Sequence, residues 1–214
     1  PGSGLKPMSK TLLERYRRIA PFYDLLDWPF EHQRYRAIRP LLFEGLSGRV
    51  LDAGVGTGRN MPFYPQGAAV TGIDISPGML ARAERRRAAL GMQVELQRGD
   101  LTRLDFADAT FSAAVAAFVF CVLPEADQPA ALAELGRVVQ PGGLIRVLEY
   151  VRPSGVLRGA IARLWEPWMA WAYGAGFDRR TKGHIGAAGL TIARERFVVA
   201  DLVKLIEIKV PIQM

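Results

Sequence analysis

Three glycines alternate along a segment that directly follows a short apolar run. In Val50-Leu-Asp-Ala-Gly-Val-Gly-Thr-Gly58, the residue Asp52 comes first and the glycines Gly54, Gly56 and Gly58 come after it. Glycine adopts the backbone angles of a sharp turn, and it lets a ligand lie against bare backbone. Open α/β sheets bind ligands at such turns, beyond the carboxyl ends of their strands. The segment therefore indicates a ligand-binding loop.

Two further carboxylates follow later apolar runs. Asp74 ends the run after the loop, where it could accept hydrogen bonds from ribose hydroxyls, and Asp100 could accept one from an adenine amino group. Asp52 could support the loop or attract a cation. The loop differs by one residue from the dinucleotide fingerprint Gly-x-Gly-x-x-Gly, since Arg59 stands beside its third glycine. Each aspartate alone is equally typical of a turn or cap, but the three together favour a nucleoside site.

The elements that must position these groups alternate between strands and helices. Ser76 and Pro77 are typical of a helix start and Gly91 of a helix end, which predicts a helix over 76–90. A second helix is expected over 127–139, and a turn at Pro141-Gly142-Gly143. A mostly parallel sheet with right-handed crossovers follows. Its strands are expected at 49–52, 69–73, 93–97, 111–120 and 144–151.

Both ends of the chain add further elements. Amphipathic spacing predicts a helix over 9–20, and a second helix is expected over 31–43 with an interruption near Pro40. Residues 156–173 have helical character. Two β-branched runs at 190–199 and 202–210 are separated by two residues, which predicts a terminal hairpin and an antiparallel sheet edge.

Four motifs taken together resemble those of class I S-adenosylmethionine-dependent methyltransferases. They are Leu51–Gly58, Gly72-Ile-Asp-Ile-Ser-Pro-Gly-Met79, Gly99-Asp-Leu101 and Leu135-Gly-Arg-Val-Val-Gln-Pro-Gly-Gly143, and the resemblance covers about residues 45–151. It implies a Rossmann-like, doubly wound, seven-stranded, mostly parallel sheet whose last strand is antiparallel. The expected division is N-terminal helices at 1–44 and a methyltransferase domain at 45–214, with a tryptophan-rich lid at about 152–188.

The resemblance also implies a cofactor, S-adenosylmethionine, with S-adenosylhomocysteine as its product. Residues matching Asp52 and the three loop glycines surround the methionyl part in this family. Those matching Asp74 and Ile75 hold the ribose and flank the adenine, which Asp100 and Leu101 meet. Further candidates on the cofactor side are Tyr16, Met79 and Phe118.

The acceptor side is expected at two segments. The segment Tyr16–Asp24 resembles the N-terminal motif of quinone-biosynthesis methyltransferases and bacterial phospholipid N-methyltransferases, in which it lies over the cofactor. Tyr16 and Tyr23 are accordingly candidate site phenols, unless they are core aromatics of a helix face. At Leu148-Glu-Tyr150, Glu149 is a candidate proton acceptor or ammonium ligand, and otherwise a plain strand-end carboxylate. Tyr150 is a candidate substrate contact.

A tryptophan-rich stretch with two arginines behind it is the lid candidate. Trp165, Trp168 and Trp171 are three residues apart, which suits core packing, an apolar slot for a lipid tail, or an aromatic belt at a membrane interface. Arg179 and Arg180 could hold a phosphate through fork-shaped bonds. We expect Trp165, Trp168, Arg179 and Arg180 to contact the substrate.

Charge and composition suggest the kind of partner. The chain of 214 residues carries a net charge of +7, and five basic residues face one acidic residue within 5–20. Residues 152–182 hold six basic residues and two acidic ones. Basic segments that also carry tryptophan and leucine favour an anionic membrane surface, with nucleic acid as the rival partner. The sequence shows neither an Asn-Pro-Pro-Tyr motif nor an RNA-binding module, and either of these would favour nucleic acid.

The sequence also predicts where the protein works. It has no apolar stretch of about 20 residues and no secretory signal, so we expect a cytoplasmic protein bound peripherally to the inner face of the membrane. The single cysteine, Cys121, fits a reducing compartment. Neither His32 nor His184 indicates a metal site. The oligomeric state is left open.

The chain as a whole resembles the short bacterial phospholipid N-methyltransferases. This implies methyl transfer to the amine of phosphatidylethanolamine and its methylated forms, which produces phosphatidylcholine at the membrane surface. Residues 118–121 and the tryptophan stretch also resemble small membrane-associated thiol methyltransferases of animals. The alternatives are therefore a methyltransferase for a quinone precursor or alkyl thiol, a nucleic-acid methyltransferase, and a non-catalytic lipid-binding protein.

Overall fold

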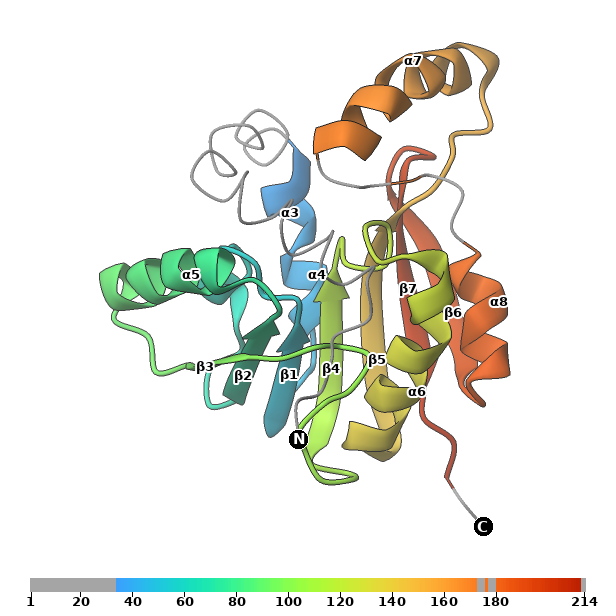
Figure 1. Cartoon of the computed structure of the whole chain (residues 1–214). Coiled ribbons are helices and arrows are strands. Elements are labelled where there is room, and N and C mark those ends of the chain that lie inside the picture. The colour runs from blue at the N-terminus through green and yellow to red at the C-terminus, as the bar shows by residue number, and fades with distance from the viewer. Residues whose placement is uncertain (1–33, 173–175, 177–179, 213–214) are drawn as a thin grey trace, which may run out of the picture.

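The core of the protein is one seven-stranded sheet with the strand order β3-β2-β1-β4-β5-β7-β6 (Figure 1). The structure is a computed structural model that describes residues 34–172, 176 and 180–212. Strands β1 to β5 are parallel, and β7 runs antiparallel to both β5 and β6, which confirms the predicted fold class. The strands are β1 Arg49–Ala53, β2 Ala69–Asp74, β3 Glu95–Arg98, β4 Phe111–Ala117, β5 Val139–Tyr150, β6 Thr191–Val199 and β7 Val203–Lys209.

Strand order reverses between β1 and β4, because the chain moves outward from β1 to β3 and then returns to the centre. Open α/β sheets bind ligands at this reversal, outside the carboxyl ends of the strands. The loop at residues 54–58 leaves β1 at that point. The topology therefore places the predicted binding loop where the fold can hold a ligand.

Helices cover both faces of the sheet. One cluster of buried side chains packs α6 and α8 against one face, and a second packs α3 and α4 against the other. Strand β4 is buried on both faces, because its successive residues alternate between the two clusters. Ala114 belongs to the first cluster and Val115 to the second. The helical elements are α3 Arg36–Ile38, α4 Pro40–Phe43, η3 Met61–Phe63, α5 Pro77–Leu90, η4 Glu125–Asp127, α6 Gln128–Val138, α7 Val156–Ala172 and α8 Thr181–Ala187.

Helix α5 begins and ends as its sequence predicts. The Met79 amide donates to Ser76 Oγ at 3.4 Å, and Pro77 occupies the first turn, where its missing N–H costs nothing. Gly91 ends the helix in the left-handed region, with φ at 63°. This helix follows β2 and its first turn lies beside Asp74, which fixes the direction of the chain at the predicted site.

Several predicted boundaries were wrong. Strand β4 ends at Ala117 instead of Phe120, because the backbone of Phe118 turns into the left-handed region with φ at 58°. The expected turn at residues 141–143 lies within β5, where a register shift separates the Phe111–Val139 pair from the Ala113–Leu144 pair. The chain also bulges there while remaining in the sheet. Strand β3 spans Glu95–Arg98, two residues later at its start than expected.

Helix α7 lies beyond the carboxyl ends of the parallel strands and apart from the sheet (Figure 1). Its 17 residues include Pro167 within the helix. No helix in the described part of the chain is long and apolar enough to cross a membrane. The predicted helix at 9–20 lies outside the described residues, and the division at residue 44 stays a prediction.

Candidate active site

The loop after β1 has the backbone that its glycines predict. Gly54, Gly56 and Gly58 have φ angles of 77°, 57° and 80°, a region that strains other residues. A methyl group at Gly54 would overlap the Val119 side chain, and one at Gly58 would lie 2.7 Å from Met61 Cε. At Gly56 the nearest atom, Gly54 O, would be 4.0 Å away. Gly54 and Gly58 therefore allow close packing, whereas Gly56 presents bare backbone to open space.

Asp74 ties the end of β2 to this loop. Its carboxylate accepts hydrogen bonds from the Gly56 amide at 2.9 Å and from the Ser76 amide at 2.8 Å. Burial raises the pKa of Asp74 to about 6, although these two bonds favour the charged form and oppose the rise. The carboxyl group thus changes charge close to neutral pH and lies beside the open backbone of Gly56.

Asp52 anchors a buried polar network beneath the loop. Asn60 Nδ2 donates to its two carboxylate oxygens at 3.1 and 3.0 Å, and the Tyr64 hydroxyl donates at 2.6 Å. Arg39 Nη1 donates to Asn60 Oδ1 at 2.6 Å. Burial raises the pKa of Asp52, while the bonds from Tyr64 and Asn60 and the charge of Arg39 oppose the rise. Asp52 therefore supports the loop, one of the two roles expected for it.

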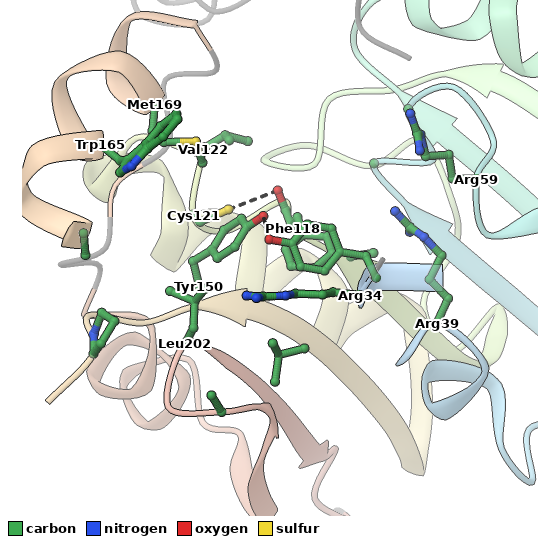
Figure 2. A pocket seen from close by; sticks show the side chains of 18 of the residues that line it. Arg34, Arg39, Arg59, Phe118, Cys121, Val122, Tyr150, Trp165, Met169 and Leu202 are labelled. Carbon is green, nitrogen blue, oxygen red and sulfur yellow. Dashed lines mark hydrogen bonds between the residues drawn. The ribbon is translucent and has the colours of Figure 1, made fainter. Parts of the chain in front are cut away.

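A cavity of about 670 Å³ lies between the glycine loop and helix α7 (Figure 2). Gly54, Gly56 and Asn60 line it on the loop side. Three aromatic side chains, Tyr35, Phe118 and Tyr150, line another part of its wall. The cavity is large enough for a drug-sized or cofactor-sized molecule, since ligand pockets commonly measure about 300–1,000 Å³.

The three aromatic rings form one packed group. The Phe118 ring centroid lies 5.0 Å from that of Tyr35 and 4.9 Å from that of Tyr150. The Tyr150 hydroxyl is 2.7 Å from the Tyr35 hydroxyl. The backbone strain of Phe118, with its positive φ, is held by the bond from its amide to Leu148 O at 2.8 Å. The group presents both ring faces and phenol oxygens to the cavity.

Helix α7 contributes apolar side chains to the cavity from the other side. These are Ile161, Ala162, Trp165 and Met169. The helix is tied to the body of the protein at its start, where the Asp201 carboxylate accepts from the Ser154 and Gly155 amides at 3.1 and 3.4 Å. A second tie joins Arg152 to Glu166 at 3.0 Å from Arg152 Nη2 to each carboxylate oxygen.

Positive side chains outnumber negative ones in the lining of the cavity. Four arginines line it, whereas Asp201 is the one carboxylate among the described lining residues. Asp201 Oδ1 accepts from Arg158 Nη1 at 2.9 Å, and this bond is the largest cause of the lowered pKa of Asp201. The lining thus suits a molecule that carries negative charge at one end. The arginines are Arg34, Arg39, Arg59 and Arg158.

The structure brings part of the predicted site together. Gly54, Gly56, Phe118, Tyr150 and Trp165 all line the cavity. Asp52, Gly58 and Asp74 support the loop from behind, through the contacts given above. Ile75 follows Asp74 and is half-buried, and Trp168 packs edge-on against Trp165 with ring centroids 5.8 Å apart.

Other predicted residues lie elsewhere among the described ones. Asp100 accepts hydrogen bonds from the amide and hydroxyl of Thr102, and Leu101 and Met79 are buried in the packed interior. Arg180 pairs with Glu125 at 3.1 Å. None of these four residues lines the cavity. Tyr16, Tyr23, Trp171's side chain and Arg179 fall outside the described residues.

Glu149 is also placed away from the cavity lining. It is 3% exposed and accepts a hydrogen bond from the Thr181 hydroxyl at 2.5 Å. Successive strand residues point to opposite faces, so Tyr150 reaches the cavity and Glu149 points toward α8. This placement gives Glu149 no direct contact with a molecule in the cavity, and its role as a proton acceptor stays a prediction without support from the geometry.

Sequence reasoning missed several residues at the site. Tyr35 and Arg39 lie in the helix that was expected over 31–43, but its helical pattern does not tell which of its polar side chains face inward. Asn60 and Tyr64 follow the loop and bond to Asp52, and Asp201 stands in the β6–β7 turn. A buried Asp that ends a strand needs donors, so the nearby Asn60 was the signal that could have been followed.

Comparisons with known proteins agree with this arrangement. The model of a methyltransferase domain matches residues 50–143. A phosphatidylethanolamine N-methyltransferase of Cereibacter sphaeroides is 39% identical over 140 residues, which are 63% of this chain and 68% of that protein. A demethylmenaquinone methyltransferase of Thermus thermophilus is 37% identical over 158 residues, or 70% of each chain.

Solved structures show the same fold at low sequence identity. The geranyl diphosphate C-methyltransferase of Streptomyces coelicolor, in complex with Mg²⁺, geranyl diphosphate and S-adenosyl-L-homocysteine, shares 15% identity with this chain and has a TM-score of 0.68. The match covers 83% of this chain and 80% of that one. At this identity the likeness carries the fold and not the acceptor.

Proposed function

The chain belongs to the class I S-adenosylmethionine-dependent methyltransferases, and we propose that it methylates the amine of phosphatidylethanolamine and of its methylated forms. The product would be phosphatidylcholine at a membrane surface. The observation that carries this proposal is the composition of the cavity, in which an apolar wall from α7 faces several arginines and an aromatic group. Such a lining suits an amphiphile with an anionic head and an apolar tail.

The residues present fit the cofactor. Gly56 offers bare backbone at the cavity, where a side chain would stand between ligand and loop. The Asp74 carboxylate lies beside that backbone, bonded to the Gly56 amide, and would accept the ribose hydroxyls there. When bound, S-adenosylmethionine supplies an electrophilic methyl group on a sulfonium. The protein then has to hold the acceptor in line with that methyl group, and such positioning lowers the barrier by about 7–11 kcal/mol at the most.

We propose that the aromatic group holds the acceptor amine. Ring faces of Tyr35, Phe118 and Tyr150 attract an ammonium by cation–π interaction, worth roughly 0.5–2 kcal/mol per contact. The phenol oxygens of Tyr35 and Tyr150 can accept N–H bonds and so direct the nitrogen lone pair. An amine attacks only when it is neutral. The surrounding arginines favour that form, since positive charge disfavours a second cation nearby.

The outer surface of α7 supports a membrane location. Val156 is 92% and Leu164 79% exposed, and Arg163 lies on the same helix. Apolar side chains beside basic ones bind anionic lipid surfaces through buried area and charge. We propose peripheral association with the inner face of the membrane, with the basic segment at 5–20 as a second contact.

A methyl-transfer assay tests the proposal. The protein is incubated with S-adenosylmethionine labelled on the methyl group and with vesicles of phosphatidylethanolamine and an anionic lipid. We expect mono-, di- and trimethylated lipid. Tyr150→Phe removes the phenol oxygen and keeps the ring, so it should lower the rate by about tenfold or more without weakening cofactor binding. Absence of labelled lipid, with cofactor binding intact, would overturn the lipid proposal and leave the methyltransferase assignment standing.

A quinone precursor or an alkyl thiol is the second candidate acceptor. A specific observation favours the quinone precursor as acceptor. A demethylmenaquinone methyltransferase is 37% identical to this chain over 158 residues. The same labelled cofactor is therefore offered with demethylmenaquinol and with an alkyl thiol in parallel reactions. Label in either of these products, and none in lipid, would select this alternative.

A further inference from the structure

Arg39 is the most deeply buried of the four arginines that line the cavity. Its residue is 6% exposed, and it lies where α3 gives way to α4. Arg34 and Arg158 are both exposed. The Arg39 guanidinium carbon also lies 5.9 Å from the centre of the Phe118 ring, at the aromatic wall. A charged group in this position has lost most of its contact with water, so its surroundings must stabilise it.

The hydrogen bonds beside Arg39 have a fixed direction. Asn60 turns its amide nitrogen toward both oxygens of Asp52, which leaves Asn60 Oδ1 to accept from Arg39. An amide flip would place Nδ2 against the guanidinium, a contact of two donors, so the orientation is determined. Asp52 therefore holds Arg39 through Asn60. The guanidinium charge also acts on Asp52, where it opposes the rise in pKa that burial causes.

The place of Arg39 matches one end of the cofactor. Arg39, Asn60, Gly54 and Gly56 line the same cavity. Asp74 bonds to the Gly56 amide within the loop, whereas Asn60 follows the loop and bonds to Asp52. If the ribose is held at Asp74, a methionyl part that follows the loop would come within reach of Asn60 and Arg39. That part ends in a carboxylate and an ammonium. A planar guanidinium is the side chain best suited to a carboxylate, which it binds with two parallel N–H bonds.

We propose that Arg39 binds the α-carboxylate of the methionyl group of S-adenosylmethionine, and that Asn60 and Asp52 are positioning residues for it. The proposal rests on the cofactor and does not depend on which acceptor is methylated. It gives the network beneath the loop a second purpose besides supporting the backbone. It also makes the carboxylate, rather than the nucleoside alone, a determinant of cofactor selection.

A ligand that lacks the carboxylate gives a direct test. Calorimetric titration measures the dissociation constants of S-adenosylmethionine and of decarboxylated S-adenosylmethionine on each protein variant. The wild type should bind the decarboxylated ligand roughly tenfold to a hundredfold more weakly, as expected for hydrogen bonds between charged groups. In Arg39→Gln the ratio of the two constants should fall to within about threefold of one, because the group that distinguishes the ligands is gone.

Matched variants separate this role from a structural one. Arg34→Gln removes the same charge from the same cavity and should leave the ratio at its wild-type value. Arg39→Lys keeps the charge without the fork and should give an intermediate ratio. Partial unfolding of a variant changes both constants equally, so it leaves the ratio unchanged. A ratio in Arg39→Gln equal to that of the wild type, or an equal fall in Arg34→Gln, would overturn the proposal.

Discussion

Gly54 and Gly45 share a left-handed backbone but have different surroundings. Comparing them separates two reasons why a position requires glycine, which are backbone strain and close packing. The φ angles are 77° and 70°, yet a methyl group would overlap Val119 at Gly54 and would meet nothing within 4 Å at Gly45. Gly45→Ala should cost about 1–2 kcal/mol of unfolding free energy through backbone strain alone. Gly54→Ala should cost about 1–3 kcal/mol more, because it also crowds packed side chains. Chemical denaturation measures both.

A second substitution checks the cause of that difference. Val119→Ala, introduced together with Gly54→Ala, makes room for the new methyl group and should restore most of the extra loss. Backbone strain would remain, so the double variant should resemble Gly45→Ala after the cost of Val119→Ala itself is subtracted. Equal losses in the two single variants would show that packing against Val119 does not matter.

The charge of Asp74 should make cofactor binding depend on pH. Ribose hydroxyls donate to the ionised carboxylate, so binding lowers a pKa that burial has raised from 3.8 to about 6. Affinity for S-adenosylhomocysteine should therefore fall as the pH drops from 7 to 5, and binding near pH 6 should release a proton. Titrations in buffers of different ionisation enthalpy measure that release. In the free protein, the raised pKa means that protonated Asp74 stabilises the fold. This stabilisation is fully present below pH 3.8 and is lost as the pH rises through about 6.

Asp74→Asn isolates this group from the neighbouring Asp52, whose pKa is raised as well. The variant should bind more weakly at pH 7, by roughly tenfold or more, and should lose the pH dependence between 5 and 7. Asp108→Asn changes an exposed carboxylate far from the loop, paired with Arg137, and serves as the control. If Asp74→Asn kept the full pH dependence, another group would be responsible for it.

At the scale of elements, helix α7 depends on the turn between β6 and β7. Asp201 in that turn accepts from the Ser154 and Gly155 amides just before α7, and it pairs with Arg158 within the helix. Asp201→Ala should loosen the start of α7 and raise the KM for the acceptor several-fold, with cofactor affinity unchanged. Hydrogen exchange of residues 153–172 should become faster in the same variant.

A conservative variant provides the control for that prediction. Asp201→Asn retains an oxygen that can accept from the two amides, although it loses the charge opposite Arg158. It should preserve slow exchange at 154–158 better than Asp201→Ala does. Identical exchange in the wild type and Asp201→Ala would contradict the anchoring role of this side chain.

The elements themselves were largely predictable, because local signals mark them. Ser76, Pro77 and Gly91 define α5, and two β-branched runs separated by two residues define the terminal hairpin. The glycine loop and Asp74 were predictable for the same reason, since turn chemistry is local. The direction in which Glu149 points, away from the cavity, was not predictable, because a shift of one residue in register decides which face of the sheet a side chain takes. The end of β4 depended on the backbone of Phe118, which no sequence pattern announced.

At the scale of the whole molecule, charge and exposed apolar surface predict vesicle binding. The net charge is +7, and α7 exposes Val156 and Leu164. Deleting residues 5–20 should reduce association with anionic vesicles more than it changes cofactor affinity. Salt at about 0.5 M should also weaken the association, because the Debye length is about 10 Å at 0.1 M and becomes shorter at higher salt. Co-sedimentation measures both effects.

Leu164→Glu is the matched change on α7, since it places a negative charge on an exposed position without touching the cavity lining. It should weaken vesicle association while cofactor affinity stays the same. Equal binding to anionic and zwitterionic vesicles, insensitive to salt, would contradict the electrostatic part of this prediction.

A crystal structure of the complex with S-adenosylhomocysteine is the most direct test of the site as a whole. We predict that the ribose hydroxyls bond to Asp74, the chain of the ligand runs along Gly54–Gly56, and the carboxylate meets Arg39. The sulfur should then face the cavity between Phe118 and α7, where the acceptor must enter. A ligand bound outside the 54–58 bend, or with its ribose remote from Asp74, would contradict the account.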